Sequence, residues 1–369
     1  MNMTFELNNL RKDSDAFSGK FTQASPVVEI FSAMVNGQEL SKYGKKADKA
    51  VAYIKELNSR ADNGDFSAIA ELNTLRRFMI EPVLMEEIKL LGIFGSYKAL
   101  GFDETVEREV YTHVGEKSRM QASNGDVVFH KVVKETYQVP TFMVSGGFEV
   151  DYRRAALGDM TKENEGMNQV RIDIRNRAAL AVIQKVYKAI KESEGVKYMA
   201  EDAGLTKTQL DRVLTNVRRF GKPTVIGDYA LLSQITPFAG YVGTINSNTI
   251  TGISEKMLNE IAENGILGVY NGAVLSEMPN QYDLNRIVGE GEEMNFDTLL
   301  PAGLGFVVPA GGKSPIATWT RGGLTSFTGN DVKTGKIMTR FDLECAVDVA
   351  KGHEHEIGLI HDTNLDDLQ

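Results

Sequence analysis

The feature that most constrains the fold is an alternation of apolar and polar residues near the C-terminus. Odd-numbered positions from Ile337 to Val349 hold Ile, Thr, Phe, Leu, Cys, Val and Val, whereas most even-numbered positions hold charged residues. Successive side chains of a β-strand point to opposite faces, so this pattern predicts a long, half-buried antiparallel strand. Cys345, the single cysteine, lies on the apolar face and is predicted to be a core residue.

A long helix is predicted well before this strand. Thr161 suits the N-cap, and Glu163 and Glu165 lie in the first turn, where the helix dipole favours negative charge. Gly195 provides a stop, and one apolar stripe holds Ile172, Ala179, Ile183, Val186 and Ile190. A helix of about 30 residues would be ~45 Å long, which is typical of a structural spine rather than of an ordinary globular helix.

Two β-rich stretches enclose a polar, turn-rich segment. The stretches are "EREVYTHV" (107–114) and "DVVFHKVVKETYQV" (126–139), and the segment between them is "GEKSRMQASNG" (115–125). They predict a long hairpin with a charged tip that carries Lys117 and Arg119. A two-stranded ribbon is marginally stable alone in water, so it must lie on its own domain or on a neighbouring chain.

Shorter elements are predicted around these two features. Helices are expected within 43–92, where Pro82 breaks or starts a helix, and over 207–219, where Thr206 is the N-cap. Residues 223–335 are rich in glycine and predict a compact mixed α and β region. A helix over 255–264 should stop at Gly265, a turn is expected at Asn271-Gly272, and strands are expected at "KPTVIGDY", "FVV" and "IATWTR".

No catalytic or cofactor motif is legible. "PAGGKSP" lacks the first glycine of a phosphate loop because Val307 stands at that position, and Phe306 continues as a strand where a dinucleotide site needs a helix. His353, His355 and His361 match no compact metal motif, so a solvated strand edge is favoured over a metal site. We therefore predict no catalytic residue, no cofactor and no metal.

Composition narrows the class of protein further. There are 41 basic and 50 acidic residues, a net charge of −9, so net electrostatics do not favour nucleic-acid binding. No segment has ~18 consecutive apolar residues, so no membrane span is predicted. One cysteine allows no intrachain disulfide, which is typical of a reducing compartment.

The order of these parts, together with two local sequences, resembles a major capsid protein of tailed bacteriophages of the Hong Kong 97 type. "SEKMLNEIAENGILGVYNGAVLSEMPNQYD" (254–283) is similar to the axial-domain stretch of that family. "GFEVDYRRAALGD" (147–159) is similar to the segment that leads into its spine helix. The resemblance covers about residues 85–365, and residues 1–84 match less well.

The resemblance implies an α+β fold with an N-arm, an extended loop (E-loop), a peripheral domain and an axial domain. It implies an N-terminal arm and helical region over 1–105 and an E-loop hairpin over 106–147. The peripheral domain would hold 148–222 plus 336–369, and the axial domain 223–335. Candidates for inter-subunit contacts are Lys117, Arg119, Arg153 and Arg154. Lys131 and Lys134 match no cross-linking motif, so no covalent cross-link is predicted.

The implied function is structural. Copies of the chain would form hexamers and pentamers of an icosahedral virion capsid, assembled in the host cytoplasm around weakly contacted double-stranded DNA, with scaffold, portal and decoration proteins as further partners. Three alternatives stay open at this point. They are an encapsulin-like compartment that encloses a cargo protein, a soluble metal-dependent enzyme using His353, His355 and His361, and a ring-forming phage adaptor.

Overall fold

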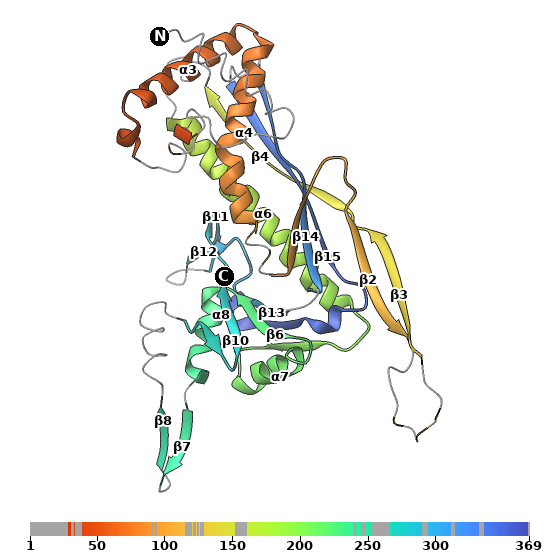
Figure 1. Ribbon diagram of the computed structural model, residues 1–369. Helices are drawn as coiled ribbons and strands as arrows, with labels where there is room; N and C mark the ends of the chain where they lie inside the picture. The colour runs from red at the N-terminus through yellow and green to blue at the C-terminus, as the bar shows by residue number, and fades with distance from the viewer. Residues whose placement is uncertain are drawn as a thin grey trace. The chain divides into compact units, whose positions relative to one another are not determined.

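The computed structural model shows a mixed α and β chain, which confirms the predicted α+β class (Figure 1). It divides into two compact units, residues 1–90, 142–178 and 320–345 in the first and residues 91–141, 179–319 and 346–369 in the second. The structure describes residues 39–89, 94–114, 129–151, 161–239, 241–245, 248–252, 266–289, 294–310, 314–331 and 336–367, together with isolated positions at 29, 30, 33, 92, 120, 123 and 125.

The first unit contains two helices that pack against each other. After the 3-10 turn η2 (Leu40–Tyr43), helix α3 spans Lys45–Asp62 and helix α4 spans Phe66–Lys89. Their shared core holds Tyr53, Leu57, Ala68, Leu72, Leu75 and Phe78. The prediction that Pro82 breaks or starts a helix is wrong, because α4 continues through it. Proline removes one backbone hydrogen bond, but buried Phe78, Ile80 and Leu84 hold the helix on both sides of it.

A four-stranded sheet has the order β1-β14-β15-β4. Its strands are β1 (Ser96–Leu100), β14 (Ile316–Asp331), β15 (Lys336–Val349) and β4 (Thr141–Asp151). On β15 every odd-numbered residue from Ile337 to Val349, Cys345 included, is buried as predicted. The other face is exposed only at the start of the strand, because Asp342 and Ala346 are buried too. The buried Asp342 is tolerated because its carboxylate accepts from Arg340 Nε at 2.7 Å.

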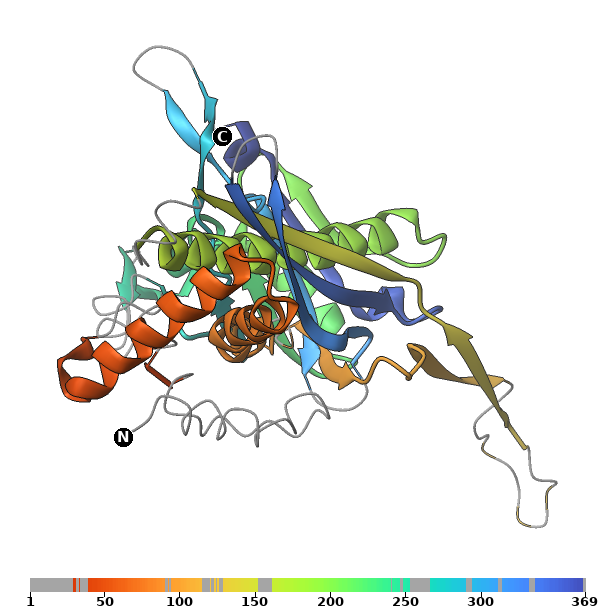
Figure 2. The same cartoon turned by 90° about the horizontal axis from the view of Figure 1, so that it is seen from above.

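Helix α6 is the predicted spine and spans Thr161–Glu192, ending just before Gly195. In Figure 2, strand β4 crosses this helix, and two glycines lie where the strand and the helix meet. A Cβ atom at Gly146 would lie 3.0 Å from Val170 Cγ1, and one at Gly166 would lie 2.9 Å from the Phe148 ring. Two glycines therefore allow the strand and the helix to approach closely. On another side of α6, Glu87 of α4 lies 4.0 Å from Arg171 and 3.8 Å from Arg175.

The second unit is built on a six-stranded mixed sheet of order β5-β16-β13-β6-β10-β9. Strand β13 pairs antiparallel with both β16 and β6, while β5–β16 and β6–β10 are parallel pairs. The strands are β5 (Tyr198–Asp202), β16 (Gly358–Asp362), β13 (Leu304–Ala310), β6 (Lys222–Gly227), β10 (Ala273–Glu277) and β9 (Val269–Tyr270). The predicted strands at "KPTVIGDY" and "FVV" are thus confirmed as central strands of one sheet.

Helix α7 (Lys207–Val217) covers this sheet with the apolar stripe predicted for it. Leu210, Val213, Leu214 and Val217 are all buried. Thr206 is the N-cap as predicted, and its side chain and that of Gln209 form a reciprocal capping box. The remaining elements of the unit are α8 (Tyr229–Ser233), η4 (Thr236–Ala239), β7 (Tyr241–Ile245), β8 (Asn248–Gly252), β11 (Tyr282–Val288), β12 (Asn295–Thr298), η6 (Glu354–Glu356) and α10 (Thr363–Asp367).

The turn between β9 and β10 is the one predicted at Asn271-Gly272. Both residues have positive φ, 47° and 80°, and Tyr270 pairs with Ala273 across them. Asn271 Nδ2 donates to Asp211 Oδ1 at 2.8 Å, and Arg218 donates to the Asn271 carbonyl at 3.1 Å. The glycine-spaced run is therefore a hairpin turn held against α7. The helix predicted over 255–264 and its stop at Gly265 lie outside the described residues.

Candidate inter-subunit surface

The predicted long hairpin is present as strands β2 (Glu107–Val114) and β3 (Lys131–Gln138), which run side by side (Figure 1). All eight residues of each strand pair in one antiparallel register, from Glu107 opposite Gln138 to Val114 opposite Lys131. Because successive side chains of a strand alternate between its faces, Arg108, Val110, Thr112 and Val114 lie on one face of the ribbon. The hairpin is regular as far as its strands are described.

The root of the hairpin is fixed by one buried arginine. Arg108 is 8 % exposed, and its guanidinium donates to the carbonyls of Asp348 at 2.7 Å, Pro315 at 2.7 Å and Ser314 at 3.1 Å. Asp348 Oδ2 lies 3.5 Å from the same group. Burial lowers the pKa of Arg108, and the charge of Asp348 opposes this shift. A planar group with several donors can satisfy these acceptors at once, which orients the ribbon where it leaves the sheet.

Tyr137 stands opposite Arg108 in the ribbon and shares the same carboxylate. Its hydroxyl donates to Asp348 Oδ2 at 2.6 Å, and the Lys351 ammonium lies 4.4 Å from its ring centroid. Burial, reinforced by the hydrogen bond to Asp348 and its charge, raises the pKa of Tyr137 to about 12. An apolar cluster of Leu100, Val106, Val139, Ala317, Trp319 and Ala346 packs around this root. The root is therefore both polar and apolar in its contacts.

Beyond the root, the ribbon is exposed and carries apolar side chains. Tyr111, Val114, Phe129, Val132 and Val133 are all exposed large hydrophobic residues. Lys134 pairs with Glu109 at 2.7 Å, a surface ion pair of small energetic value. Exposed apolar side chains on an unsupported ribbon are typical of a surface that another chain covers.

A second exposed apolar hairpin lies in the same unit. Tyr282, Ile287, Met294 and Phe296 of β11, β12 and their connection are exposed, and the Tyr282 and Phe296 rings lie 6.5 Å apart. An ion pair of 2.7 Å joins the exposed Arg286 of β11 to the buried Asp297 of β12. The register shifts between Asp283 and Ile287, which marks a bulge.

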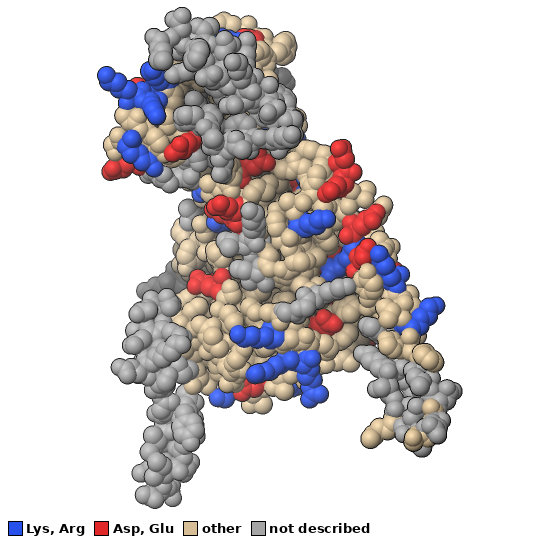
Figure 3. Space-filling view, viewed as in Figure 1, with Lys and Arg blue, Asp and Glu red and all other residues tan. Residues whose placement is uncertain are grey.

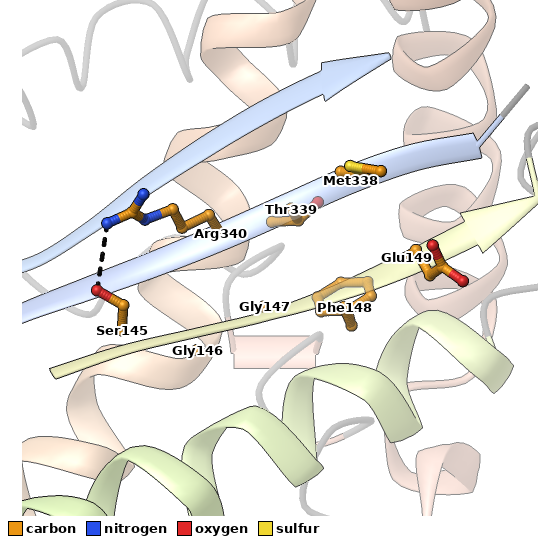
Figure 4. Close-up of a pocket in the computed structure, with 8 residues that line it drawn as sticks. All are labelled: Ser145, Gly146, Gly147, Phe148, Glu149, Met338, Thr339 and Arg340. Carbon is orange, nitrogen blue, oxygen red and sulfur yellow. Dashed lines mark hydrogen bonds between the residues drawn. The ribbon is translucent and has the colours of Figure 1, made fainter. Parts of the chain in front are cut away.

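The first unit presents an open groove on the outer face of its sheet, between β4 and β15. It is lined by Ser145, Gly146, Gly147, Phe148, Glu149, Met338, Thr339 and Arg340. Figure 4 shows Arg340 reaching across to Ser145, with a hydrogen bond of 3.3 Å. Glu149 forms an ion pair with Lys336 at the other end of the groove. Because β4 is the edge strand of the sheet, its outer edge is open to pairing with a further chain.

The four predicted contact residues, Lys117, Arg119, Arg153 and Arg154, lie outside the described residues. Their role in contacts between subunits therefore stays a prediction. The described hairpin contributes a different set instead. The sequence analysis did not identify Arg108 and Asp348. Arg108 lies on the same strand face as the apolar Val110. A charged residue on an apolar strand face is the sequence feature that indicates a buried partner.

The three C-terminal histidines do not converge. His353 Nδ1 lies 2.7 Å from Glu356 Oε1, and its ring lies 6.4 Å from that of His355. His361 pairs instead with Glu201 at 3.0 Å, and the Lys191 hydrogen bond, followed by that of His361, lowers the pKa of Glu201. The predicted strand edge is wrong for His361, because β16 is an interior strand between β5 and β13. Within the described ranges, no group of three or more His, Cys, Asp or Glu side chains is placed to hold a metal ion.

The helices described here also bear on the predicted absence of a membrane span. Among the described residues, no helix combines the length and the apolar character needed to cross a bilayer.

A regular exposed hairpin with a fixed root, a long spine helix and a compact mixed sheet are the parts that the resemblance to phage capsid proteins implied. The chain belongs to the family described as "SPbeta prophage-derived putative capsid protein YonB", whose family model matches residues 6–361. The predicted recognition as a phage capsid protein is confirmed by this match, and the chain is a structural major capsid protein. No curated protein matches the sequence.

Solved structures similar to this chain include phage structures and an encapsulin complex. A Microbacterium phage Oxtober96 structure is 10% identical over 72% of this chain and 89% of that chain, with a TM-score of 0.47. A Mycobacterium phage Adephagia structure is 13% identical over 72% and 87%, with a TM-score of 0.45. The holo-SrpI encapsulin complex from Synechococcus elongatus PCC 7942 is 12% identical over 75% and 88%, with a TM-score of 0.42. The capsid class rests on the family match.

Proposed function

We propose that copies of this chain assemble into the hexamers and pentamers of an icosahedral phage head that encloses double-stranded DNA. The head would be assembled in the host cytoplasm, and scaffold, portal and decoration proteins would be further partners. The role is structural rather than catalytic. The observation that carries the proposal is the β2–β3 hairpin, whose root is fixed by Arg108 while its shaft exposes apolar side chains.

The hairpin supports assembly because its root is buried within the chain while its shaft exposes apolar side chains. The buried Arg108 root orients the ribbon at a cost that a free loop would not need, since it desolvates a charge. The exposed Val132, Val133 and Phe129 gain free energy only when another surface removes them from water. A second copy of the chain supplies such a surface, and a closed shell repeats the contact many times.

The four-part organisation expected from the sequence belongs to the same proposal. In it, 1–105 form an arm and helical region, 106–147 the E-loop hairpin, 148–222 plus 336–369 the peripheral domain, and 223–335 the axial domain. Lys117 and Arg119 near the hairpin tip, and Arg153 and Arg154 before the spine helix, would make contacts with neighbouring copies.

Electron microscopy of the expressed chain tests the proposal, with two matched variants. Val132→Glu places a charge on the exposed hairpin, and Val196→Glu places the same charge on an exposed loop, where the native side chain is 63 % exposed. We expect closed particles from the native chain and from Val196→Glu, and few or none from Val132→Glu. Each variant should unfold at the denaturant concentration of the native chain, because neither side chain is buried.

Three outcomes would contradict the proposal. A native chain that stays a monodisperse monomer would refute shell assembly, and rings in place of closed particles would indicate an adaptor. Closed particles from Val132→Glu in native yield would show that the hairpin shaft is not the contact. The contents of the particles decide between the two shell functions, because nuclease-protected DNA supports a phage head and a packaged protein supports an encapsulin-like compartment.

A further inference from the structure

Helix α7 and the turn after it carry a local excess of positive charge. Residues 203–227 contain five basic residues and one acidic residue, Asp211, whereas the whole chain has 41 basic and 50 acidic residues. We call the five basic residues the α7 face. They are Lys207, Arg212, Arg218, Arg219 and Lys222.

The packing of α7 turns these side chains outward. The apolar stripe of Leu210, Val213, Leu214 and Val217 is buried against the sheet, so the charged positions lie on the opposite side of the helix. All five residues of the α7 face are exposed. Figure 3 shows Lys and Arg side chains gathered over the position of α7, with few acidic side chains among them.

The positive charge of the α7 face is not neutralised by the described part of the chain. Asp211 Oδ1 accepts from Tyr270 and Asn271, and no ion pair joins it to the α7 face. Lys207, Arg212 and Arg218 donate to backbone carbonyls of Phe238, Met199 and Asn271 at 2.8, 3.2 and 3.1 Å. These bonds position three side chains but leave their charge uncompensated. The side chains of Arg219 and Lys222 form no hydrogen bond or ion pair with a described residue, although Arg219 N donates to the Asn216 carbonyl and Lys222 pairs with Ala310 in the sheet.

Helix stability explains only part of this pattern. Cations near a helix C-terminus are favoured by the dipole, which accounts for Arg218 and Arg219. The same dipole disfavours Lys207, which is the first residue of α7, and it is neutral toward Arg212 in the middle of the helix. Five charges without an ion-pair partner on α7, the turn after it and the first residue of β6 also raise their mutual repulsion, so an anionic partner would relieve it.

We infer that the α7 face binds the phosphate backbone of duplex DNA, an inference that rests on the proposed function. Arginine and lysine side chains with free donors bind phosphate oxygens without reading sequence. A protein partner is less well matched, because the cores of protein interfaces are depleted in charge and rich in aromatic residues, whereas Phe220 is the single aromatic residue of 203–227. That ring is already in contact with Tyr198 and His355. The acidic remainder of the chain keeps the overall affinity low and sensitive to salt.

A titration of the purified chain with a fluorescent 30-base-pair duplex, repeated over a series of salt concentrations, tests the inference. The variant Arg219→Gln/Lys222→Gln removes the two charges that hold no described contact. We expect its slope of log K against log salt to be shallower by about 2, because each phosphate contact contributes about 0.9. The control Lys185→Gln/Lys188→Gln removes the same charge from exposed positions of α6 and should leave the slope unchanged.

Three outcomes would overturn the inference. The first is an unchanged slope in the α7 variant. The second is an equal change in both variants, which would report net charge alone. The third is normal DNA binding together with a loss of closed particles, which would make the α7 face a contact between subunits. Electron microscopy of the α7 variant separates the two proposals. Closed particles with weakened DNA binding support both, whereas a native chain that binds DNA through the α7 face but never closes refutes the shell alone.

Discussion

Arg108 is the residue on which the orientation of the hairpin depends. Its guanidinium satisfies three carbonyls and contacts one carboxylate in a buried site, and it is 8 % exposed. A methionine at this position would fill similar volume but would leave these acceptors without donors. The loss of stability would come from the buried acceptors that are left without hydrogen bonds, and not from the packing of the removed side chain.

We predict that Arg108→Met lowers the free energy of unfolding by about 3–5 kcal/mol, because three carbonyls lose their donor and the partly buried Asp348 loses its cation. The same substitution at the exposed Arg177 of α6 is the control and should change stability by less than about 0.5 kcal/mol. Urea denaturation of the unassembled chain measures both. Equal values for the two variants would show that the root does not depend on the guanidinium.

Tyr137 predicts a loss of stability at high pH. Its pKa is raised from the ordinary 10.0 to about 12, so the folded chain keeps a proton that the unfolded chain releases. The contribution is therefore complete below pH 10 and is lost as the pH rises from 10 to 12. We expect Tyr137→Phe to make the fall in unfolding free energy over this range shallower, by up to about 1.4 kcal/mol per pH unit.

Denaturation curves at several pH values between 9 and 12 provide the comparison. Burial also raises the pKa of Cys345 to about 12, so the native chain and Tyr137→Phe share that part of the alkaline response. Only the difference between the two chains reports Tyr137. Parallel curves would mean that its hydroxyl titrates alike in both states.

Individual residues were predictable where their role is local. Cys345 followed from the alternation of its strand, and Thr206 followed from the spacing of a helix cap. Arg108 was not predictable in this way, because its acceptors are more than 200 positions away in sequence. A charged residue on an apolar strand face indicates that a buried partner is needed, but the identity of that partner depends on the tertiary structure.

At the scale of elements, the β9–β10 turn shows how local geometry fixes a sheet edge. Asn271 and Gly272 both have positive φ, the backbone of a two-residue hairpin turn whose twist matches that of the strands. The turn also brings Asn271 to Asp211 and Arg218, so one edge of the sheet is tied to α7.

We predict that Gly272→Ala destabilises the chain by about 1–2 kcal/mol, the cost of placing an L-residue with a Cβ in this conformation. The added methyl group would lie 3.1 Å from Arg218 Nη1, a flexible side chain that can move away, so strain of the backbone dominates. Gly101→Ala is the control, because no atom lies within 4 Å of its Cβ position and its φ is ordinary. Thermal unfolding of both variants checks the difference, and equal melting temperatures would contradict the prediction.

The elements were largely predictable because their patterns are periodic. The 32-residue α6, the hairpin strands and the long alternating β15 all appear where the sequence places them. Two predictions were wrong for one shared reason. Packing carried α4 through Pro82, and packing covered the second face of β15 at Asp342 and Ala346, so tertiary contacts overrode local preference.

At the scale of the whole molecule, assembly should determine the measured stability. Anything that binds the folded chain but not the unfolded chain stabilises it by mass action, and a second copy is such a ligand. Exposed apolar side chains on two separate hairpins provide surface for it.

We therefore predict that closed particles melt at a higher temperature than the dissociated chain, with a difference that grows with protein concentration. Val132→Glu should melt at the temperature of the dissociated native chain at every protein concentration, because the variant folds but does not associate. Calorimetry of particles and of dissociated chains, separated by size-exclusion chromatography, gives both values. Identical melting of particles and free chains would contradict a stabilising contact at the hairpin.

The whole architecture could be predicted only by resemblance, since the order of parts matches a known capsid type while no single residue decides it. The strand order of both sheets was not predictable, because β5, β16 and β13 come from three distant parts of the chain. The charge of the α7 face was visible in the sequence, but its exposure required knowledge of which side of the helix packs.

The buried root of the hairpin also imposes an order on synthesis. Arg108 emerges from the ribosome long before Ser314, Pro315 and Asp348, the residues that receive its hydrogen bonds. Until residue 348 has been made, the ribbon has no fixed direction, and its apolar shaft cannot be presented to a neighbour in the native way. The chain therefore becomes competent to associate only after residue 348 has been made, which separates folding of each copy from association with the next.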